Sequence, residues 1–292
     1  MHTFTKVLCA TDLSAAADVA LKQAATVAGL YQAKLVVFHA LPSALASTPL
    51  FPQDSLAANE GFVALERRVL EALHARVAAV AGRGAHVEVV LGTGSPHAEI
   101  VRTAENAKAD LIVVGGEGAP NVARAVLGAV AERVIRYAHA PVWVARTGPD
   151  VGPVVAGTDF SAASNAAVDI AVEYARRAGA KVTLCHALSV EKLVPPPGPA
   201  VEQPAFPTWT VEDVVRLRGA ATQKLSALVP DAELVVADER PGAALPALAS
   251  KRLARLICVG TAGHTGLARI LLGSVAEEVV RHAPCPVIVT RR

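Results

Sequence analysis

Short β-branched apolar runs alternate with longer alanine-rich amphipathic stretches along the first half of the chain. Most of these runs are continuous, as expected of strands that are buried on both faces of a sheet. We expect strands at Val7–Ala10, Leu35–His39, Val87–Leu91, Leu111–Val114 and Val142–Ala145. We expect helices at Ser14–Ala28, Leu56–Ala81, Pro96–Ala107 and Ala129–His139. This alternation predicts a doubly wound α/β domain with a parallel sheet.

The same order of segments recurs once, which indicates a tandem duplication. The matched pairs are Ala10–Ser14 (ATDLS) with Gly157–Ser161 (GTDFS), Lys34–Leu41 with Lys181–Leu188, Leu111–Gly115 with Leu256–Gly260, and Ala140–Val144 with Cys285–Val289. We therefore expect two tandem domains, residues 1–147 and 151–292, each a five-stranded parallel sheet flanked by about four helices. Turn-forming residues at Thr147–Asp150 mark the boundary between them.

Composition and charge exclude several classes of protein. Hydrophobic residues make up 52% of the chain and charged residues 18%, which argues against a disordered protein. A formal net charge of +2 supplies no general field for nucleic acid or an anionic membrane. We find neither a signal peptide nor a good membrane span, and the four cysteines lack CxxC spacing. We expect a cytoplasmic protein with buried thiols and no metal site.

Glycines with a defined spacing follow the fourth expected strand of the second half. Gly260 and Gly263 are followed, after nine residues, by Gly273. A glycine at a strand end lets a ligand approach the backbone, and the N–H groups of a helix that begins at Gly273 can bind phosphate. A structural interpretation stays open, in which the glycines serve turns and Ser274 with Glu277 forms a capping box.

The pattern G-x2-G-x9-G-[S/T] after an apolar strand resembles the adenine-nucleotide motif of the universal stress protein family. The likeness continues from Gly263–Glu277 to Arg281–Val287, and the first half has the same outline, so nearly the whole chain resembles a tandem member. The resemblance implies an adenine nucleotide alpha-hydrolase-like fold. It also implies a regulatory protein of the stress response that binds ATP, either alone or together with Mg²⁺.

The resemblance also implies roles for particular residues. Asp159 would hold ribose hydroxyls or a metal ion that bridges the phosphates, and the backbone of Ala187 would read the adenine edge. One departure is that Ala262 and His264 stand where members often have His and then Arg; His264 is either a phosphate donor or a solvated loop histidine. The complete expected binding set is Thr158, Asp159, Ala187, Gly260, Gly263, His264, Gly273, Ser274 and Val275.

The corresponding motif in the first half has lost binding groups. The glycine spacing survives at Gly115, Gly118 and Gly128, but Ala129 replaces the Ser or Thr and Glu117 adds negative charge. Like charges close to a polyphosphate cost free energy unless a metal ion intervenes. We therefore predict that the nucleotide binds mainly in the second domain, and weakly or not at all in the first.

Three classes of function stay open. The leading hypothesis is nucleotide-dependent regulation of an unknown protein partner, because no Walker A, GxGxxG, HExxH or GxSxG pattern is present and no residue set indicates catalysis. The alternatives are a slow Mg²⁺-dependent ATPase that uses Asp159 and a nucleotide-free interaction module. Members of the family typically dimerise through their last strands, so Pro141–Ala145 and Pro286–Thr290 are expected to pair within the chain; a homodimer stays open.

Overall fold

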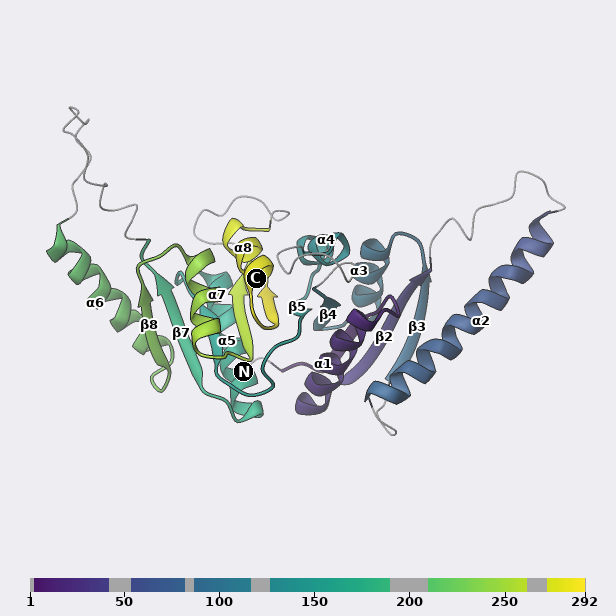
Figure 1. The fold of residues 1–292 in the computed structure, drawn as a ribbon, viewed down its shortest axis with the longest axis horizontal. Coiled ribbons are helices and arrows are strands. Elements are labelled where there is room, and N and C mark those ends of the chain that lie inside the picture. Colours follow the sequence, from purple (N-terminus) through teal and green to yellow (C-terminus); the bar gives the residue numbers. More distant parts are fainter. Residues whose placement is uncertain are drawn as a thin grey trace, which may run out of the picture. The chain divides into compact units, whose positions relative to one another are not determined.

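The structure is a computed structural model that describes residues 3–41, 54–81, 87–116, 127–189, 210–261 and 272–291, the side chains of residues 54–60 excepted. The chain forms two compact units that divide between Thr147 and Gly148. We call them the N-terminal and the C-terminal domain. Figure 1 shows their helices and strands.

The N-terminal domain is a parallel sheet with helices between its strands. The strands are β1 (Lys6–Ala10), β2 (Lys34–Leu41), β3 (Val87–Thr93), β4 (Leu111–Gly115) and β5 (Val142–Ala145). The helices are α1 (Ala15–Tyr31), α2 (Asp54–Ala81), α3 (Pro96–Ala107) and α4 (Ala129–Tyr137). The strand order is β3-β2-β1-β4-β5.

The C-terminal domain repeats this architecture, with strand order β8-β7-β6-β9-β10. Its strands are β6 (Val154–Gly157), β7 (Val182–Ala187), β8 (Glu233–Ala237), β9 (Leu256–Gly260) and β10 (Val287–Thr290). Its helices are α5 (Ala162–Ala178), α6 (Val211–Leu228), α7 (Pro241–Lys251) and α8 (Ser274–His282). The predicted fold class, two tandem doubly wound α/β domains, is confirmed.

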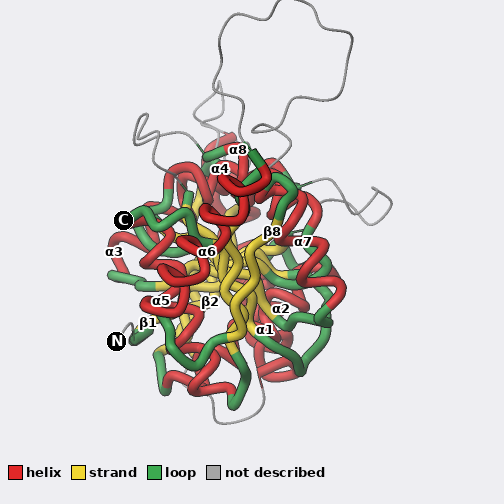
Figure 2. The backbone as a smooth tube through the Cα atoms, turned by 90° about the vertical axis from the view of Figure 1, so that its left-hand side faces the viewer, coloured by secondary structure: helices red, strands yellow, loops and turns green. Residues whose placement is uncertain are grey.

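Both faces of each sheet are covered, which explains the continuous apolar runs of the sequence. In the N-terminal domain α1 packs beside α2 and α3 packs beside α4, as right-handed crossovers require when the strand order reverses at β1. Figure 2 shows the strands between helices. All four cysteines are buried thiols, as predicted, and burial raises the pKa of Cys9 to about 12.

Two helix C-termini differ from the sequence prediction. Helix α1 continues past Ala28 to Tyr31, because Gln32 adopts the left-handed conformation (φ 55°) and donates its N–H to Ala28 and Gly29 carbonyls. Helix α4 ends at Tyr137, two residues before His139, because Ala138 is already extended. Local backbone conformation at the cap residue therefore sets both ends.

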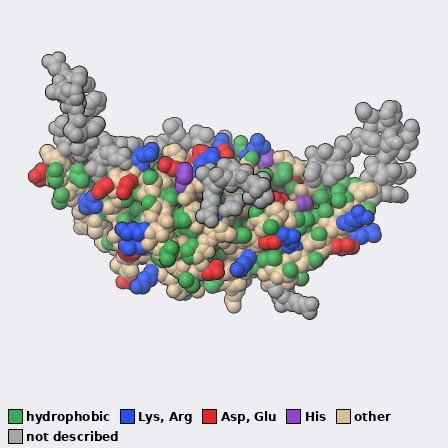
Figure 3. All heavy atoms as spheres, viewed as in Figure 1, with side chains coloured by type: hydrophobic (Ala, Val, Ile, Leu, Met, Phe, Trp, Pro, Cys, Tyr) green, Lys and Arg blue, Asp and Glu red, His purple; other side chains and the backbone are tan. Residues whose placement is uncertain are grey.

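Charged side chains of both signs are interspersed on the face shown in Figure 3. Within the described part of the chain, no helix combines the length and the apolarity that crossing a bilayer requires.

Glu173 of α5 makes the stability of the C-terminal domain depend on pH. Its side chain is buried, and hydrogen bonds from Arg176 (2.8 Å) and Arg177 (2.6 Å) lower its pKa to about 2. Because the folded-state pKa lies below the unfolded value of about 4.3, the stabilisation is complete above that value and is lost as the pH falls towards 2.

We predict that Glu173→Gln lowers the melting temperature by roughly 2–4 °C at pH 7, and that the difference from wild type shrinks as the pH falls from about 5 to 2. Thermal denaturation across this pH range measures the effect. Asp169→Asn, an exposed position on the same helix, is the matched control and should show little change. A Glu173→Gln difference that stays constant with pH would contradict the assignment.

Candidate functional site

The strand order of each sheet reverses next to its first strand, between β1 and β4 and between β6 and β9. In parallel α/β sheets, ligands bind beyond the carboxyl ends of the strands at this point. In the C-terminal domain the segments at this edge are the β6–α5 turn, the end of β7, the end of β9 and the N-terminus of α8.

The β6–α5 turn is fixed by its own hydrogen bonds. The Thr158 N–H donates to the Cys185 carbonyl (2.9 Å), and Thr158 Oγ1 accepts from the Phe160 N–H (2.9 Å). Phe160 lies in the left-handed region (φ 65°), and Asp159 Oδ1 accepts from the Ser161 N–H (3.0 Å). Ser161 caps α5, and its side chain accepts from the Ser164 N–H (3.3 Å). The turn thus holds the half-buried Asp159 at the edge of the sheet.

His186 holds this turn against β7, a role that the sequence analysis did not assign. Its Nδ1 lies 2.8 Å from the Thr158 carbonyl oxygen, and since a carbonyl only accepts, Nδ1 carries the hydrogen. The ring also contacts Phe160, with 4.7 Å between centroids. The available signal was the recurrence of His39 as His186 near the end of the second strand of each half.

Helix α8 begins without a side-chain cap. Gly273 occupies the cap position and donates its N–H to the Thr261 carbonyl (2.9 Å), which ties the helix start to the end of β9. The alternative interpretation, a capping box between Ser274 and Glu277, is therefore wrong, because Gly273 is the N-cap and Ser274 is the first helical residue. The helix N-terminus keeps its N–H donors and its positive dipole end.

The packing of the fold itself requires a glycine at position 260, and the expected approach of a ligand stays a prediction. A Cβ atom at this position would lie 2.9 Å from backbone atoms of Ala163 and Ser164 in the first turn of α5. The Thr290 hydroxyl donates to the Ala163 carbonyl (3.1 Å) and holds that turn in place. Close helix packing therefore explains the glycine at the end of β9.

The structure brings most of the predicted set to one edge of the C-terminal sheet. These residues are Thr158, Asp159, Ala187, Gly260, Gly273, Ser274 and Val275. Gly263 and His264 lie outside the described residues, as do Glu117 and Gly118 of the first motif.

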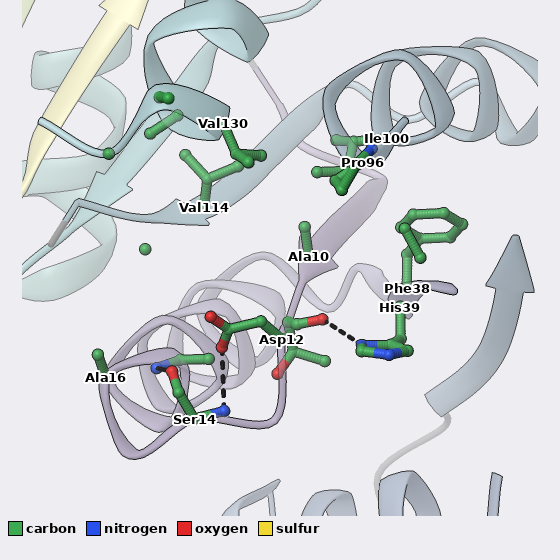
Figure 4. Close-up of a pocket in the computed structure, with 17 residues that line it drawn as sticks. Ala10, Asp12, Ser14, Ala16, Phe38, His39, Pro96, Ile100, Val114 and Val130 are labelled. Carbon is green, nitrogen blue, oxygen red and sulfur yellow. Dashed lines mark hydrogen bonds between the residues drawn. The ribbon is translucent and has the colours of Figure 1, made fainter. Parts of the chain in front are cut away.

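The N-terminal domain builds the same turn and, next to it, a cavity. His39 Nδ1 donates to the Thr11 carbonyl (2.8 Å), Leu13 has φ 65°, and Asp12 Oδ1 accepts from the Ser14 N–H (2.9 Å). Figure 4 shows the cavity, of about 300 Å³, and its lining. The lining residues are Ala10, Thr11, Asp12, Ser14, Ala16, Ala17, Phe38, His39, Ala40, Pro96, Ile100, Val114, Gly115, Gly128, Ala129, Val130 and Ala131.

Comparison with known proteins identifies the family. The model of the universal stress protein family matches residues 3–146 and again residues 151–291. This chain belongs to the universal stress protein family. It is a tandem member with two universal stress protein domains, as the resemblance implied.

Related universal stress proteins match this chain over nearly the whole length of both proteins. One from Mycobacterium tuberculosis is 31% identical over 299 residues, which cover 98% of this chain and 97% of that protein. One from Mycolicibacterium smegmatis is 28% identical over 295 residues, with 98% and 96% covered. The crystal structure of a universal stress protein from Archaeoglobus fulgidus has a TM-score of 0.70 at 21% identity and covers 98% of both chains, which supports the fold.

We predict that His186→Phe destabilises the C-terminal domain by about 1–3 kcal/mol, because the Thr158 carbonyl loses its donor while the ring volume is kept. Urea denaturation measures the change in the free energy of unfolding. His74→Phe on the exposed surface of α2 makes the same replacement and should change stability by less than about 0.5 kcal/mol. Equal effects of the two variants would show that the His186 hydrogen bond contributes nothing specific.

Proposed function

We propose that this universal stress protein binds ATP with Mg²⁺ in its C-terminal domain and that nucleotide occupancy regulates its affinity for a protein partner in the stress response. The observation that carries the proposal is the start of α8: an uncapped helix N-terminus beginning Gly273–Ser274–Val275, tied to the end of β9. Strand β9 pairs with β6, which leads into the Thr158–Asp159 turn.

The helix start has the chemistry that phosphate requires. N–H groups of the first turn and the positive dipole end attract anions. The exposed hydroxyl of Ser274 adds a donor. In the N-terminal domain the equivalent residue is Ala129, which has no hydroxyl. This difference supports nucleotide binding mainly in the C-terminal domain.

Asp159 and Ala187 supply groups for the nucleoside. A carboxylate has about four acceptor sites, so Asp159 retains capacity for ribose hydroxyls or Mg²⁺ while it accepts from Ser161. In β7 the backbone carbonyl of Cys185 points towards β6, where it accepts from the Thr158 N–H. The backbone groups of every second residue of a strand point to the same side, so those of Ala187 also point towards β6. Strand β6 ends at Gly157, so Ala187 lies beyond its end. It is therefore available to an adenine edge.

Regulation by binding requires that the partner distinguish the occupied from the empty protein. Nucleotide can shift this equilibrium only by the difference in its affinity for the partner-bound and partner-free forms. Turnover is not required, and we propose that the protein binds ATP without hydrolysing it rapidly. The slow-ATPase alternative would assign Asp159 and Mg²⁺ to hydrolysis.

We predict that ATP with Mg²⁺ raises the melting temperature of the C-terminal transition, because a ligand that binds only the native state stabilises it by about 2.7 kcal/mol at a hundredfold excess over Kd. Gly273→Glu places a carboxylate at the phosphate position and should abolish the rise. The matched variant Gly128→Glu makes the same change at the start of α4 and should retain it.

Three outcomes would contradict the proposal. A rise that is lost in Gly128→Glu and retained in Gly273→Glu would move the nucleotide to the N-terminal domain. Rapid metal-dependent release of phosphate, abolished by Asp159→Ala, would favour the ATPase. An unchanged melting temperature in ATP would favour the nucleotide-free module.

A further inference from the structure

We propose that the C-terminal domain carries a docking surface for a peptide segment of a partner protein, in which apolar side chains are flanked by carboxylates. The surface consists of Val151, Lys181, Lys251, Leu253 and Arg255, which lie just before strands β6, β7 and β9 or at the end of α7. We call it the amino-edge surface, because it lies at the opposite edge of the sheet from the candidate nucleotide site. Docking there does not require a bound nucleotide.

Two large apolar side chains are exposed side by side on the amino-edge surface. Val151 is 77% exposed and Leu253 is 68% exposed. At Gly152, between Val151 and β6, a Cβ atom would lie 2.2 Å from the Leu253 carbonyl oxygen, so the two segments run against each other. The Arg255 N–H donates to the Pro153 carbonyl (3.0 Å) and ties them together. Adjoining exposed apolar side chains on a fixed backbone are typical of an interaction site.

The backbone at Leu253 adds a second cost. Leu253 lies in the left-handed region (φ 49°), in a turn where its N–H donates to the Ser250 carbonyl (3.2 Å) and the Ala254 N–H donates to the Ala249 carbonyl (2.8 Å). Glycine and asparagine are the residues that this position at a helix end favours. A leucine here costs free energy through its conformation and through its exposure, so the fold itself does not explain it.

The N-terminal domain builds the same turn without exposed apolar side chains. Lys108, at the position equivalent to Leu253, has φ 53° and a charged side chain. Phe4, at the position equivalent to Val151, is fully buried and packs against Tyr31, with 4.8 Å between ring centroids. The exposed apolar pair therefore belongs to the C-terminal domain alone among the described residues of these two turns.

Positive charge has been added at the same place. Lys251 and Arg255 stand where the N-terminal domain has Asn106 and Asp110. Asp110 accepts hydrogen bonds from its own domain, whereas the half-buried Arg255 donates only weakly to a backbone carbonyl (3.4 Å) and lies over the ring of Tyr174. Within the described part of the chain, no carboxylate forms a salt bridge with Lys251 or Arg255.

This charge selects the occupant. The exposed Lys181 adds a third cation, since its carbonyl accepts from the first residue of β6, and Arg252 is already paired with Glu233. Asp150 is the opposing carboxylate next to Val151. A segment with Asp or Glu beside apolar side chains complements this surface. A second copy of the same surface would place cations opposite cations, which disfavours self-association.

The experiment selects peptides from a phage-displayed library of random dodecapeptides on the full-length protein without nucleotide. We expect the selected peptides to carry Asp or Glu on both sides of apolar side chains. As labelled synthetic peptides, they should bind wild type at least about tenfold more tightly than Leu253→Asn, which removes an anchor. Val215→Asn makes a matched change at an exposed valine of α6 and should leave the affinity unchanged.

Stability separates a docking residue from a structural one. Leu253→Asn should not lower the melting temperature, because asparagine suits the left-handed conformation. A fall of more than about 2 °C would assign Leu253 to the fold and overturn the proposal.

Charge is tested separately from the apolar contact. Lys251→Gln should weaken binding of the selected peptides by about threefold at low ionic strength, and the difference should shrink in high salt. Lys22→Gln, at an exposed lysine of α1, is the matched control and should bind like wild type. Equal binding by Lys251→Gln and wild type would overturn the choice of an acidic partner.

The remaining outcomes also decide. Failure to select any peptide that distinguishes wild type from Leu253→Asn would overturn the proposal, as would binding to phosphatidylglycerol vesicles that Leu253→Asn abolishes, since the surface would then bind a membrane. Gly273→Glu should leave peptide binding unchanged. Absence of an ATP-dependent rise in melting temperature with retained peptide binding would overturn only the proposed function.

Discussion

One hydrogen bond sets the geometry of the turn that faces the ligand edge in each domain. The imidazole of His39 donates to the Thr11 carbonyl and that of His186 donates to the Thr158 carbonyl, both at 2.8 Å. Two residues further on, the backbone takes φ 65°, a conformation that costs free energy for a residue with a side chain and persists only when neighbouring contacts hold it. The position of each aspartate depends on this constraint.

On this shared framework the two domains have diverged in chemistry and in shape. Ser274 offers a hydroxyl at a helix start where the N-terminal domain has Ala129. The Thr290 hydroxyl holds the first turn of α5 against Gly260, whereas no atom of the described residues lies within 4 Å of a Cβ built at Gly115. The two domains therefore keep the same turn and differ in the groups and the packing around it.

Sequence patterns predicted what depends on burial and local conformation. Buried strands are continuous apolar runs, and helix α3 has its predicted bounds, Pro96–Ala107. Patterns could not predict what depends on contacts between distant segments. The capping box at Ser274 was wrong because a hydrogen bond to Thr261 places Gly273 at the cap, and the cavity beside Gly115 depends on which residue opposes it in space. The preference of nucleotide for one domain stays a prediction.

The division of roles between the domains is the central claim, and a crystal structure of the full chain grown with ATP and Mg²⁺ tests it most directly. We expect nucleotide in the C-terminal domain alone, with its phosphates at the N–H groups of Gly273, Ser274 and Val275 and its ribose beside Asp159. Equal occupancy of both domains, or phosphates bound at Gly128 in the N-terminal domain, would contradict it.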